Sequence, residues 1–388
     1  MSGTISIEEG VSNTDFQVAV VGAGVVGAAV ALALSRRGAA VALLEAEDEA
    51  GLGASGTNSG ILHMGFDSTP GELETDLILR SAALRPPVIE ALGIPFDRCG
   101  AAMRPADDSQ RDAIARLARN AERNGVDVTL DDDGSLAVPG ESVTDPIAYT
   151  VALAGAAQRH GAELRTGFRV ADIEPGAGGL RLASRSGDRV SCSIAVNCAG
   201  LYADEIAWLA GDDSFEIYPR KGEFLVFESP PEGLDRILLP VPTERTRGVL
   251  VFPSVDGKVI AGPTAIDGQD KHDWSVRPEA VDEIRPKAAA LLPALEDSEP
   301  IATYAGLRTA GRGVNYLIGA SRACERLVNV PAIRSTGLTA SLGIGERVAE
   351  IVAGLGIEPS PEQPLEPAPE PHSAGPWWRR VAEHRGVM

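Results

Sequence analysis

Residues 16–45 constrain the fold more than any other part of the chain, and they read FQVAVVGAGVVGAAVALALSRRGAAVALLE. Valines gather before Gly22, and alanines and leucines follow Gly27, which predicts a buried strand, a glycine turn and a buried helix. A second strand, VALLE, completes a βαβ unit. Residues 18–34 lack charged and polar side chains, but the strand–turn–helix pattern argues against a membrane span.

The glycine turn has the spacing G-x-G-x-x-G at Gly22, Gly24 and Gly27. One glycine permits the turn, one lets a pyrophosphate approach the backbone, and one lets helix and strand pack closely. Glu45 ends the second strand, where a carboxylate accepts hydrogen bonds from a ribose diol. This Rossmann-type beginning predicts adenine dinucleotide binding, and NADP is disfavoured because Glu45 would repel a 2′-phosphate.

Two later segments favour FAD over NAD. AVNCAG, residues 195–200, is a strand that runs into a glycine turn, and STGLT, residues 335–339, is a turn before a helix. A nicotinamide enzyme usually completes its site within the first half of the fold, so two further approaches indicate a longer cofactor. The STGLT turn would aim backbone N–H groups and a helix N-terminus at a flavin, and the alternative is an ordinary helix cap.

Length and charge limit the architecture and the partners. A chain of 388 residues exceeds the size at which one core keeps growing, so we expect two domains. The formal net charge of −20 repels polyanions, so nucleic acid is not an expected partner. An anionic substrate must therefore be held by a few local arginines or lysines.

Cysteine usage and the N-terminus indicate a cytoplasmic protein. The start MSGTISIEEG lacks a basic signal region, and the four cysteines show neither CxxC spacing nor the density of a disulfide scaffold. No transmembrane segment is expected. Seven prolines between Pro359 and Pro376 predict a stiff, poorly packing linker before WWRRVAEHR, a short basic helix that leaves room for peripheral membrane or partner docking.

The remaining pattern gives the fold class. Residues 145–160 form a helix capped by Asp145, and residues 215–263 alternate as antiparallel strands. We expect an α/β fold, with a Rossmann-type FAD-binding domain and a second, mainly antiparallel-sheet substrate domain (α+β). The expected bounds are 15–90, 143–213 and 301–356 for the FAD-binding domain, 91–142 and 214–300 for the substrate domain, and 357–388 for the proline-rich linker and C-terminal tail.

Several sequence blocks carry a family resemblance. They are VVGAGVVG, SGTNSGILHMGFDSTPGEL, VNCAGLYAD, RKGEFLVF, GPTAID, TYAGLRT and IRSTGLTASLGIGERVAEIV. Over residues 18–354 the chain resembles the D-amino-acid-oxidase-like FAD enzymes, in particular the FAD-dependent glycerol-3-phosphate dehydrogenases and oxidases and the L-2-hydroxyglutarate oxidases. The NSGILHxGFD and GLTAS blocks are the most specific.

This resemblance implies roles for three catalytic candidates. His63 would lie over the flavin near N5, and the alternative is a satisfied core histidine. Arg308 would receive the anionic group of the substrate. Lys221 would reach the flavin side of the substrate cavity, and the alternative is a surface lysine at a strand end. The cofactor-binding residues expected from the motifs and the resemblance are Gly22, Gly24, Val26, Gly27, Glu45, Ser55, Asn58, Ser59, Val170, Ala199, Gly200, Gly337, Leu338 and Thr339.

The resemblance also implies a reaction. A small anionic secondary alcohol would be oxidised to a ketone by hydride transfer to flavin N5, with glycerol 3-phosphate as the first candidate substrate. The alternatives are L-2-hydroxyglutarate or another 2-hydroxy acid, an amino-acid oxidase acting on CH–NH₂, and flavin binding without catalysis. The electrons would pass to oxygen or to a quinone or protein acceptor. No metal site is expected, and no cysteine follows Cys324 that could hold an iron–sulfur cluster.

Overall fold

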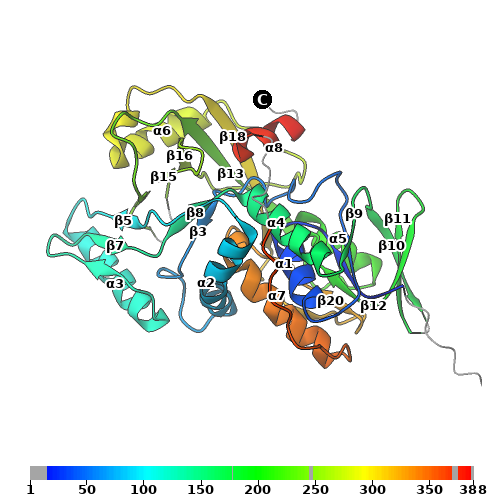
Figure 1. Cartoon of the computed structure of the whole chain (residues 1–388). Helices are drawn as coiled ribbons and strands as arrows, with labels where there is room; N and C mark the ends of the chain where they lie inside the picture. The colour runs from blue at the N-terminus through cyan, green and yellow to red at the C-terminus, as the bar shows by residue number, and fades with distance from the viewer. Residues whose placement is uncertain (1–14, 177, 244–247, 369–374, 386–388) are drawn as a thin grey trace, which may run out of the picture.

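The structure is a computed structural model that describes residues 15–176, 178–243, 248–368 and 375–385. Two large β-sheets organise these residues into two halves, with helices packed around them (Figure 1). One sheet is built on parallel strands and the other is mainly antiparallel. The expected fold class is therefore confirmed.

The parallel sheet contains the βαβ unit. Five strands run parallel in the order β9, β2, β1, β12 and β20, and β10 and β11 extend the sheet antiparallel beyond β12. The strand bounds are β1 Phe16–Val21, β2 Val41–Leu44, β9 Glu163–Arg165, β10 Val170–Gly176, β11 Gly179–Ser184, β12 Arg189–Asn197, β19 Gly319–Ala320 and β20 Leu327–Asn329. The apolar β12 lies inside the sheet because it pairs with β1 on one side and with β11 and β20 on the other.

Both faces of the parallel sheet are covered. Four helices and the sheet form one core, in which α1 packs against α4 and α7. These helices are α1 Val25–Ser35, α2 Leu73–Leu92, α4 Pro146–Arg159 and α7 Gly337–Gly354. The opposite face packs against α5 (Ala203–Leu209) and the β10–β11 hairpin. Asp145 accepts N–H bonds from Ile147 and Ala148 at 2.8 and 2.9 Å, so its predicted capping of α4 is confirmed.

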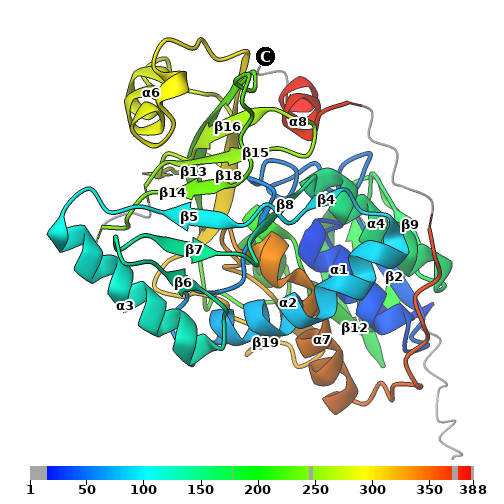
Figure 2. The same cartoon turned by 60° about the vertical axis from the view of Figure 1, so that its left-hand side comes forward.

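The second sheet is centred on β13 (Ile217–Phe227), which pairs with β16, β17 and β18. Its other strands are β5 Ala101–Met103, β6 Thr129–Leu130, β7 Leu136–Val138, β14 Ile237–Leu239, β15 Leu250–Pro253, β16 Val259–Gly262, β17 Ile266–Asp267 and β18 Ala302–Gly311. Helix α6 (Ala280–Leu291) covers one face of the sheet at β13, β15 and β16. Helix α3 (Asp108–Asn124) lies at the end of the sheet that β6 forms (Figure 2). The sequence groups β18 with the FAD-binding domain, but its entire length pairs with β13 in this sheet.

Short elements link the two halves. A three-stranded sheet consists of β3 (Ile61–Leu62), β4 (Phe96–Asp97) and β8 (Ser142–Thr144). Two short 3-10 helices, Gly200–Tyr202 and Pro293–Leu295, follow β12 and α6. Within the described ranges, every helix is too short or too polar to cross a bilayer.

The C-terminal tail packs more closely than its sequence predicts. The proline-rich segment is hydrogen-bonded to the body of the protein, for example from Ser360 N–H to the Arg37 carbonyl and from Ala368 N–H to the Ala91 carbonyl, each at 2.9 Å. Helix α8 (Trp377–Arg385) buries both of its tryptophans in a core that it shares with strands of the second sheet. Its apolar side is therefore covered by the chain itself and is not an exposed docking surface.

The packing at Gly27 gives a test of the fold. A Cβ at Gly27 would overlap the Gly22 carbonyl oxygen, so we predict that Gly27→Ala lowers the free energy of unfolding by at least about 2 kcal/mol. The measurement is the denaturant midpoint of the apoprotein. Gly155→Ala, in the interior of α4, is the control, because its Cβ would lie 3.6 Å from the nearest atom, Arg159 Nη1. Equal midpoints for the two variants would contradict the prediction.

Candidate functional site

A first cavity, which we call the nucleotide cavity, lies at the carboxyl ends of the parallel strands and has a volume of about 400 Å³. The loops that follow β1, β2, β12 and β20 all contribute to its walls, as expected for a ligand site in an open parallel sheet. The predicted cofactor residues that line it are Gly22, Gly24, Val26, Glu45, Ser55, Asn58, Val170, Ala199, Gly200, Gly337 and Leu338.

The glycine turn of this cavity has no room for side chains. Gly22 has a φ of 99°, and a Cβ there would lie 2.5 Å from the Cys198 carbonyl oxygen. A Cβ at Gly24 would lie 3.0 Å from Ser55 Oγ, which accepts the N–H of Val25 at 2.9 Å. Ser55 thus caps the first turn of α1, and the backbone stays accessible to a ligand.

Glu45 is fixed against the same turn. Its two carboxylate oxygens accept the N–H groups of Ala23 at 2.7 Å and Glu47 at 3.0 Å. Burial raises the pKa of Glu45 above its ordinary value, and these backbone hydrogen bonds partly oppose that effect. The carboxylate is therefore held in one orientation at the cavity wall, with further lone pairs available to hydroxyl groups.

Three predicted cofactor residues do not line the nucleotide cavity. Gly27 lets α1 pack closely against the backbone of the glycine turn, and Ser59 lines a second cavity instead. Thr339 Oγ1 accepts the His63 N–H at 3.2 Å and donates to the Ile61 carbonyl at 3.4 Å. Thr339 therefore ties the first turn of α7 to β3.

The second cavity, which we call the interdomain cavity, has a volume of about 530 Å³ and lies against the antiparallel sheet. It contains His63 and Arg308, two of the three predicted catalytic residues. Its walls share a set of residues with the nucleotide cavity, so the two spaces adjoin. The shared residues are Ala54, Asn58, Thr309, Ile333 and Arg334.

His63 follows β3 and is held by a buried carboxylate. His63 Nδ1 lies 2.8 Å from Glu141 Oε2, and Glu141 Oε1 accepts the N–H of Met64 at 2.7 Å. The Glu141 side chain is fully buried, whereas that of His63 is 21% exposed. An ionised carboxylate can only accept, so Nδ1 carries a proton and Nε2 is the basic nitrogen. His63 is therefore partly exposed at the cavity wall, with one ring nitrogen paired to a buried carboxylate.

Arg308 has a second arginine opposite it. Arg220 on β13 pairs directly with Arg308 on β18, so both side chains are on the same sheet face, and both residues line the interdomain cavity. Arg308 donates to the carbonyl groups of Arg220 and Thr264 at 3.3 Å each, and it has no carboxylate partner among the described residues. Burial and the charge of Arg220 lower the pKa of Arg308 to about 10.

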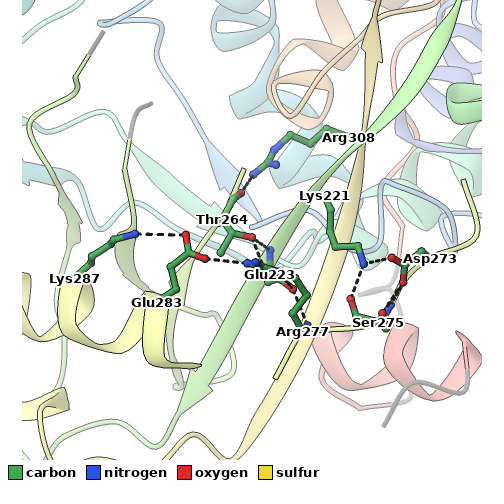
Figure 3. A network of polar contacts seen from close by, with 9 residues as sticks. All are labelled: Lys221, Glu223, Thr264, Asp273, Ser275, Arg277, Glu283, Lys287 and Arg308. Carbon is green, nitrogen blue, oxygen red and sulfur yellow. Dashed lines mark hydrogen bonds and ion pairs between the residues drawn. The ribbon is translucent and has the colours of Figure 1, made fainter. Parts of the chain in front are cut away.

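Lys221 does not reach the interdomain cavity. Successive side chains of a strand point to opposite faces, and Arg220 occupies the cavity face. Lys221 Nζ instead lies 2.5 Å from Asp273 Oδ2 and 3.0 Å from the Ser275 carbonyl oxygen (Figure 3). The lysine is buried in mid-strand, so neither the expected cavity role nor the surface alternative describes it.

A polar network around the buried Glu223 is connected to Arg308 through Thr264 (Figure 3). Glu223 has a fully buried side chain that accepts from Arg277 Nη2 at 2.8 Å and from Thr264 Oγ1 at 2.9 Å. Burial alone would raise the pKa of Glu223, but the hydrogen bonds from Arg277 and Thr264 hold it below its ordinary value. The network fixes Thr264, whose carbonyl oxygen accepts from Arg308.

Comparison with known proteins identifies the family. The model of a family described as FAD dependent oxidoreductase matches residues 17–351. The chain belongs to this family. Among FAD dependent oxidoreductases it is similar to the glycerol 3-phosphate dehydrogenase of Caloramator mitchellensis, with 29% identity over 88% of this chain and 74% of the relative. The resemblance stated from the sequence is thus confirmed.

Two further proteins are similar to this chain. The L-2-hydroxyglutarate dehydrogenase of Escherichia coli strain K12 is 26% identical over 67% of each chain. A solved structure of the L-alpha-glycerophosphate oxidase from Mycoplasma pneumoniae with FAD bound has a TM-score of 0.83 and 24% identity, covering 90% of this chain and 98% of that one. The fold of the two domains is therefore shared with an FAD-containing protein.

The walls of the nucleotide cavity fit FAD, the cofactor of the family. A glycine turn at the N-terminus of α1 suits a diphosphate, and Glu45 suits a ribose diol. The shared wall continues into the interdomain cavity beside the first turn of α7, which leaves space for the rest of a long ligand. When bound, FAD supplies the acceptor for the two electrons of a substrate oxidation.

The sequence misses Glu141 and Arg220. Glu141 lies in the loop between β7 and β8, 78 positions from His63, and no local motif marks it. A sequence signal for Arg220 does exist. Side chains alternate between the two faces of a strand, so in RKGEFLVF Arg220 shares a face with Phe224, whereas its neighbour Lys221 does not. Phe224 stacks on Tyr304 with ring centroids 4.7 Å apart, and both side chains are on the Arg220 face.

The contact between His63 and Glu141 predicts the tautomer of the imidazole. Glu141→Gln can turn its NH₂ group towards Nδ1, so we expect the ring proton of neutral His63 to move from Nδ1 to Nε2. Nitrogen-15 NMR of histidine-labelled protein reports the change directly. Glu228→Gln is the control, because Glu228 is exposed and paired with Lys258. An unchanged tautomer in Glu141→Gln would show that another group sets it.

Proposed function

We propose that this FAD dependent oxidoreductase oxidises a small anionic secondary alcohol to a ketone, and that glycerol 3-phosphate is its substrate. The observation that carries the proposal is the pair of arginines, Arg220 and Arg308, in the cavity that is also lined by His63, whose imidazole is paired with the buried Glu141. The relatives named as glycerol 3-phosphate dehydrogenase and oxidase support this substrate. The product would be dihydroxyacetone phosphate.

The two guanidinium groups favour a doubly charged anion. The pKa of Arg308 is lowered by burial and by the positive charge of Arg220, and a bound anion would relieve both effects. The Arg308 guanidinium can donate two parallel hydrogen bonds to phosphate oxygens, whereas Arg220 also pairs with Asp267 at 2.9 Å and would share its donors between that carboxylate and the anion. Arg334, which lines both cavities, adds a third cation near the same space. These three arginines would supply the local positive charge that an anionic substrate requires in a chain of net charge −20.

His63 supplies the base. With its Nδ1 proton donated to Glu141, Nε2 can accept the hydroxyl proton of the substrate as the C–H bond breaks. The buried carboxylate then stabilises the imidazolium that forms. The arginines, which line the same cavity, would hold the anionic end of the substrate, so the reacting carbon would be oriented by two contacts rather than one.

Two other substrates follow from the same geometry. L-2-Hydroxyglutarate also carries two negative charges, and the chain is similar to dehydrogenases named for it. An amino acid would present an ammonium group, which must lose a proton before oxidation, and two arginines would accept only its carboxylate. We therefore rank glycerol 3-phosphate first, 2-hydroxy acids second and amino acids third.

The electron acceptor is proposed as oxygen or as a quinone or protein carrier. Lys221 gives no reason to prefer either acceptor, because it is paired with Asp273 on the other face of β13. A burst of peroxide on mixing the reduced protein with air would identify an oxidase. Slow reaction with air and fast reaction with a quinone would identify a dehydrogenase.

The substrate prediction is tested anaerobically with the FAD-loaded protein. We expect glycerol 3-phosphate to bleach the flavin absorbance faster than L-2-hydroxyglutarate, lactate or amino acids at equal concentration. His63→Ala should keep its FAD and be reduced at least about 100-fold more slowly. Faster bleaching by another compound would replace the substrate, and full activity of His63→Ala would remove this residue from the mechanism.

The arginine pair predicts a change in KM. Arg308→Lys keeps the charge but loses the paired donors, so we expect KM to rise at least about 10-fold with a smaller change in kcat. Arg220→Lys should raise KM in the same direction. Arg236→Lys is the matched control, because Arg236 is exposed and paired with Asp235. An unchanged KM in Arg308→Lys would place the substrate anion elsewhere.

A further inference from the structure

The C-terminal helix α8 closes one side of the nucleotide cavity. Arg385 at the end of α8 lines this cavity together with Trp274, which lies in the loop between β17 and α6. The Arg385 guanidinium carbon lies 4.8 Å from the centre of the Trp274 ring, and Nη2 donates to the Leu52 carbonyl at 3.0 Å. The family match ends at residue 351, before α8 begins.

One face of α8 packs on the segments that form the cavity. Trp377, Val381 and Arg385 are spaced four residues apart and therefore share that face. The Trp377 ring meets Tyr304 of β18 edge-on at 5.2 Å, and a Cβ at Gly56 would lie 2.8 Å from Val381. Figures 1 and 2 show α8 beside β18, where the two halves of the molecule meet.

The loop that carries Trp274 is fixed by a buried lysine of β13. Lys221 binds the Asp273 carboxylate and the Ser275 carbonyl, the residues on either side of Trp274 (Figure 3). Lys221 therefore holds the wall of the nucleotide cavity, although it does not reach the interdomain cavity. Trp274 and Arg385 then stack on each other and close the cavity from two different segments.

The charges around Arg385 suit an anionic ligand. Three carboxylates, Glu45, Glu47 and Glu205, line the nucleotide cavity, so a bound diphosphate needs a nearby cation. The Arg385 side chain is 19% exposed, against 41% for Arg169 in the same cavity. Its nearest carboxylate contact is 3.4 Å long, to Glu47, and its buried Nε has no hydrogen-bond partner among the described residues.

We infer that α8 is part of the FAD site and that Arg385 binds the diphosphate of the cofactor. The helix would then contact the cofactor that is bound by its own chain, and it would not act as a docking element for a partner. This inference concerns the cofactor and is independent of which substrate is oxidised.

The test measures ligand affinity of the apoprotein by calorimetry. FAD and ADP carry the diphosphate, and adenosine carries none. We expect Arg385→Gln to raise the Kd of FAD and of ADP about 10-fold and to leave that of adenosine within about two-fold. Arg385→Lys, which keeps the charge, should recover part of the affinity for FAD and ADP.

The matched control is Arg379→Gln on the same helix, which makes the same change of charge. Arg379 is 57% exposed, pairs with Glu383 and does not line the cavity, so its Kd values should equal those of the unchanged protein. Equal FAD affinity in Arg385→Gln and Arg379→Gln would overturn the inference. An equal loss for FAD, ADP and adenosine, with a lower melting temperature of the apoprotein, would also overturn it by showing a packing role only.

Discussion

The site depends on the continuous pairing of β13 with β18, which runs from Ile217 opposite Gly311 to Val226 opposite Ala302. This register decides which side chains face the interdomain cavity. On one face it brings the two guanidinium groups of Arg220 and Arg308 together, and on the other it directs Lys221 and Glu223 into buried polar networks. A slip of one residue would exchange the two sets and remove the cations from the cavity.

Arginines and carboxylates share the walls of both cavities in a protein of net charge −20. Three arginines and two carboxylates line the interdomain cavity, and four arginines and three carboxylates line the nucleotide cavity. The two cavities share Arg334, so the cofactor and substrate regions are electrostatically connected. Buried carboxylates serve a different purpose, because Glu141 and Glu223 orient His63 and Thr264 rather than face the ligand space.

Both halves of the chain contribute to the cofactor region. The glycine turn, Glu45 and the first turn of α7 come from the parallel-sheet half, while Trp274 comes from the other half and Arg385 from the tail. The described part of the proline-rich segment is hydrogen-bonded to residues at the ends of α1 and α2.

The sequence by itself determined the βαβ unit, the glycine turn, Glu45, the capping of α4 by Asp145 and the two-sheet architecture. These features depend on residues close together in the chain, where periodicity and spacing leave few alternatives. It also indicated His63 and Arg308 by resemblance, and the structure brings these residues into one cavity.

Only the tertiary structure decided what surrounds those residues. The partners Glu141 and Arg220, the position of Lys221, the pairing of β18 and the docking of α8 all depend on contacts between distant segments. Such contacts follow from strand register and from which apolar faces meet, and the composition of a single segment does not specify either. For that reason local patterns identified the elements of this protein, and packing decided which of their side chains face the same space.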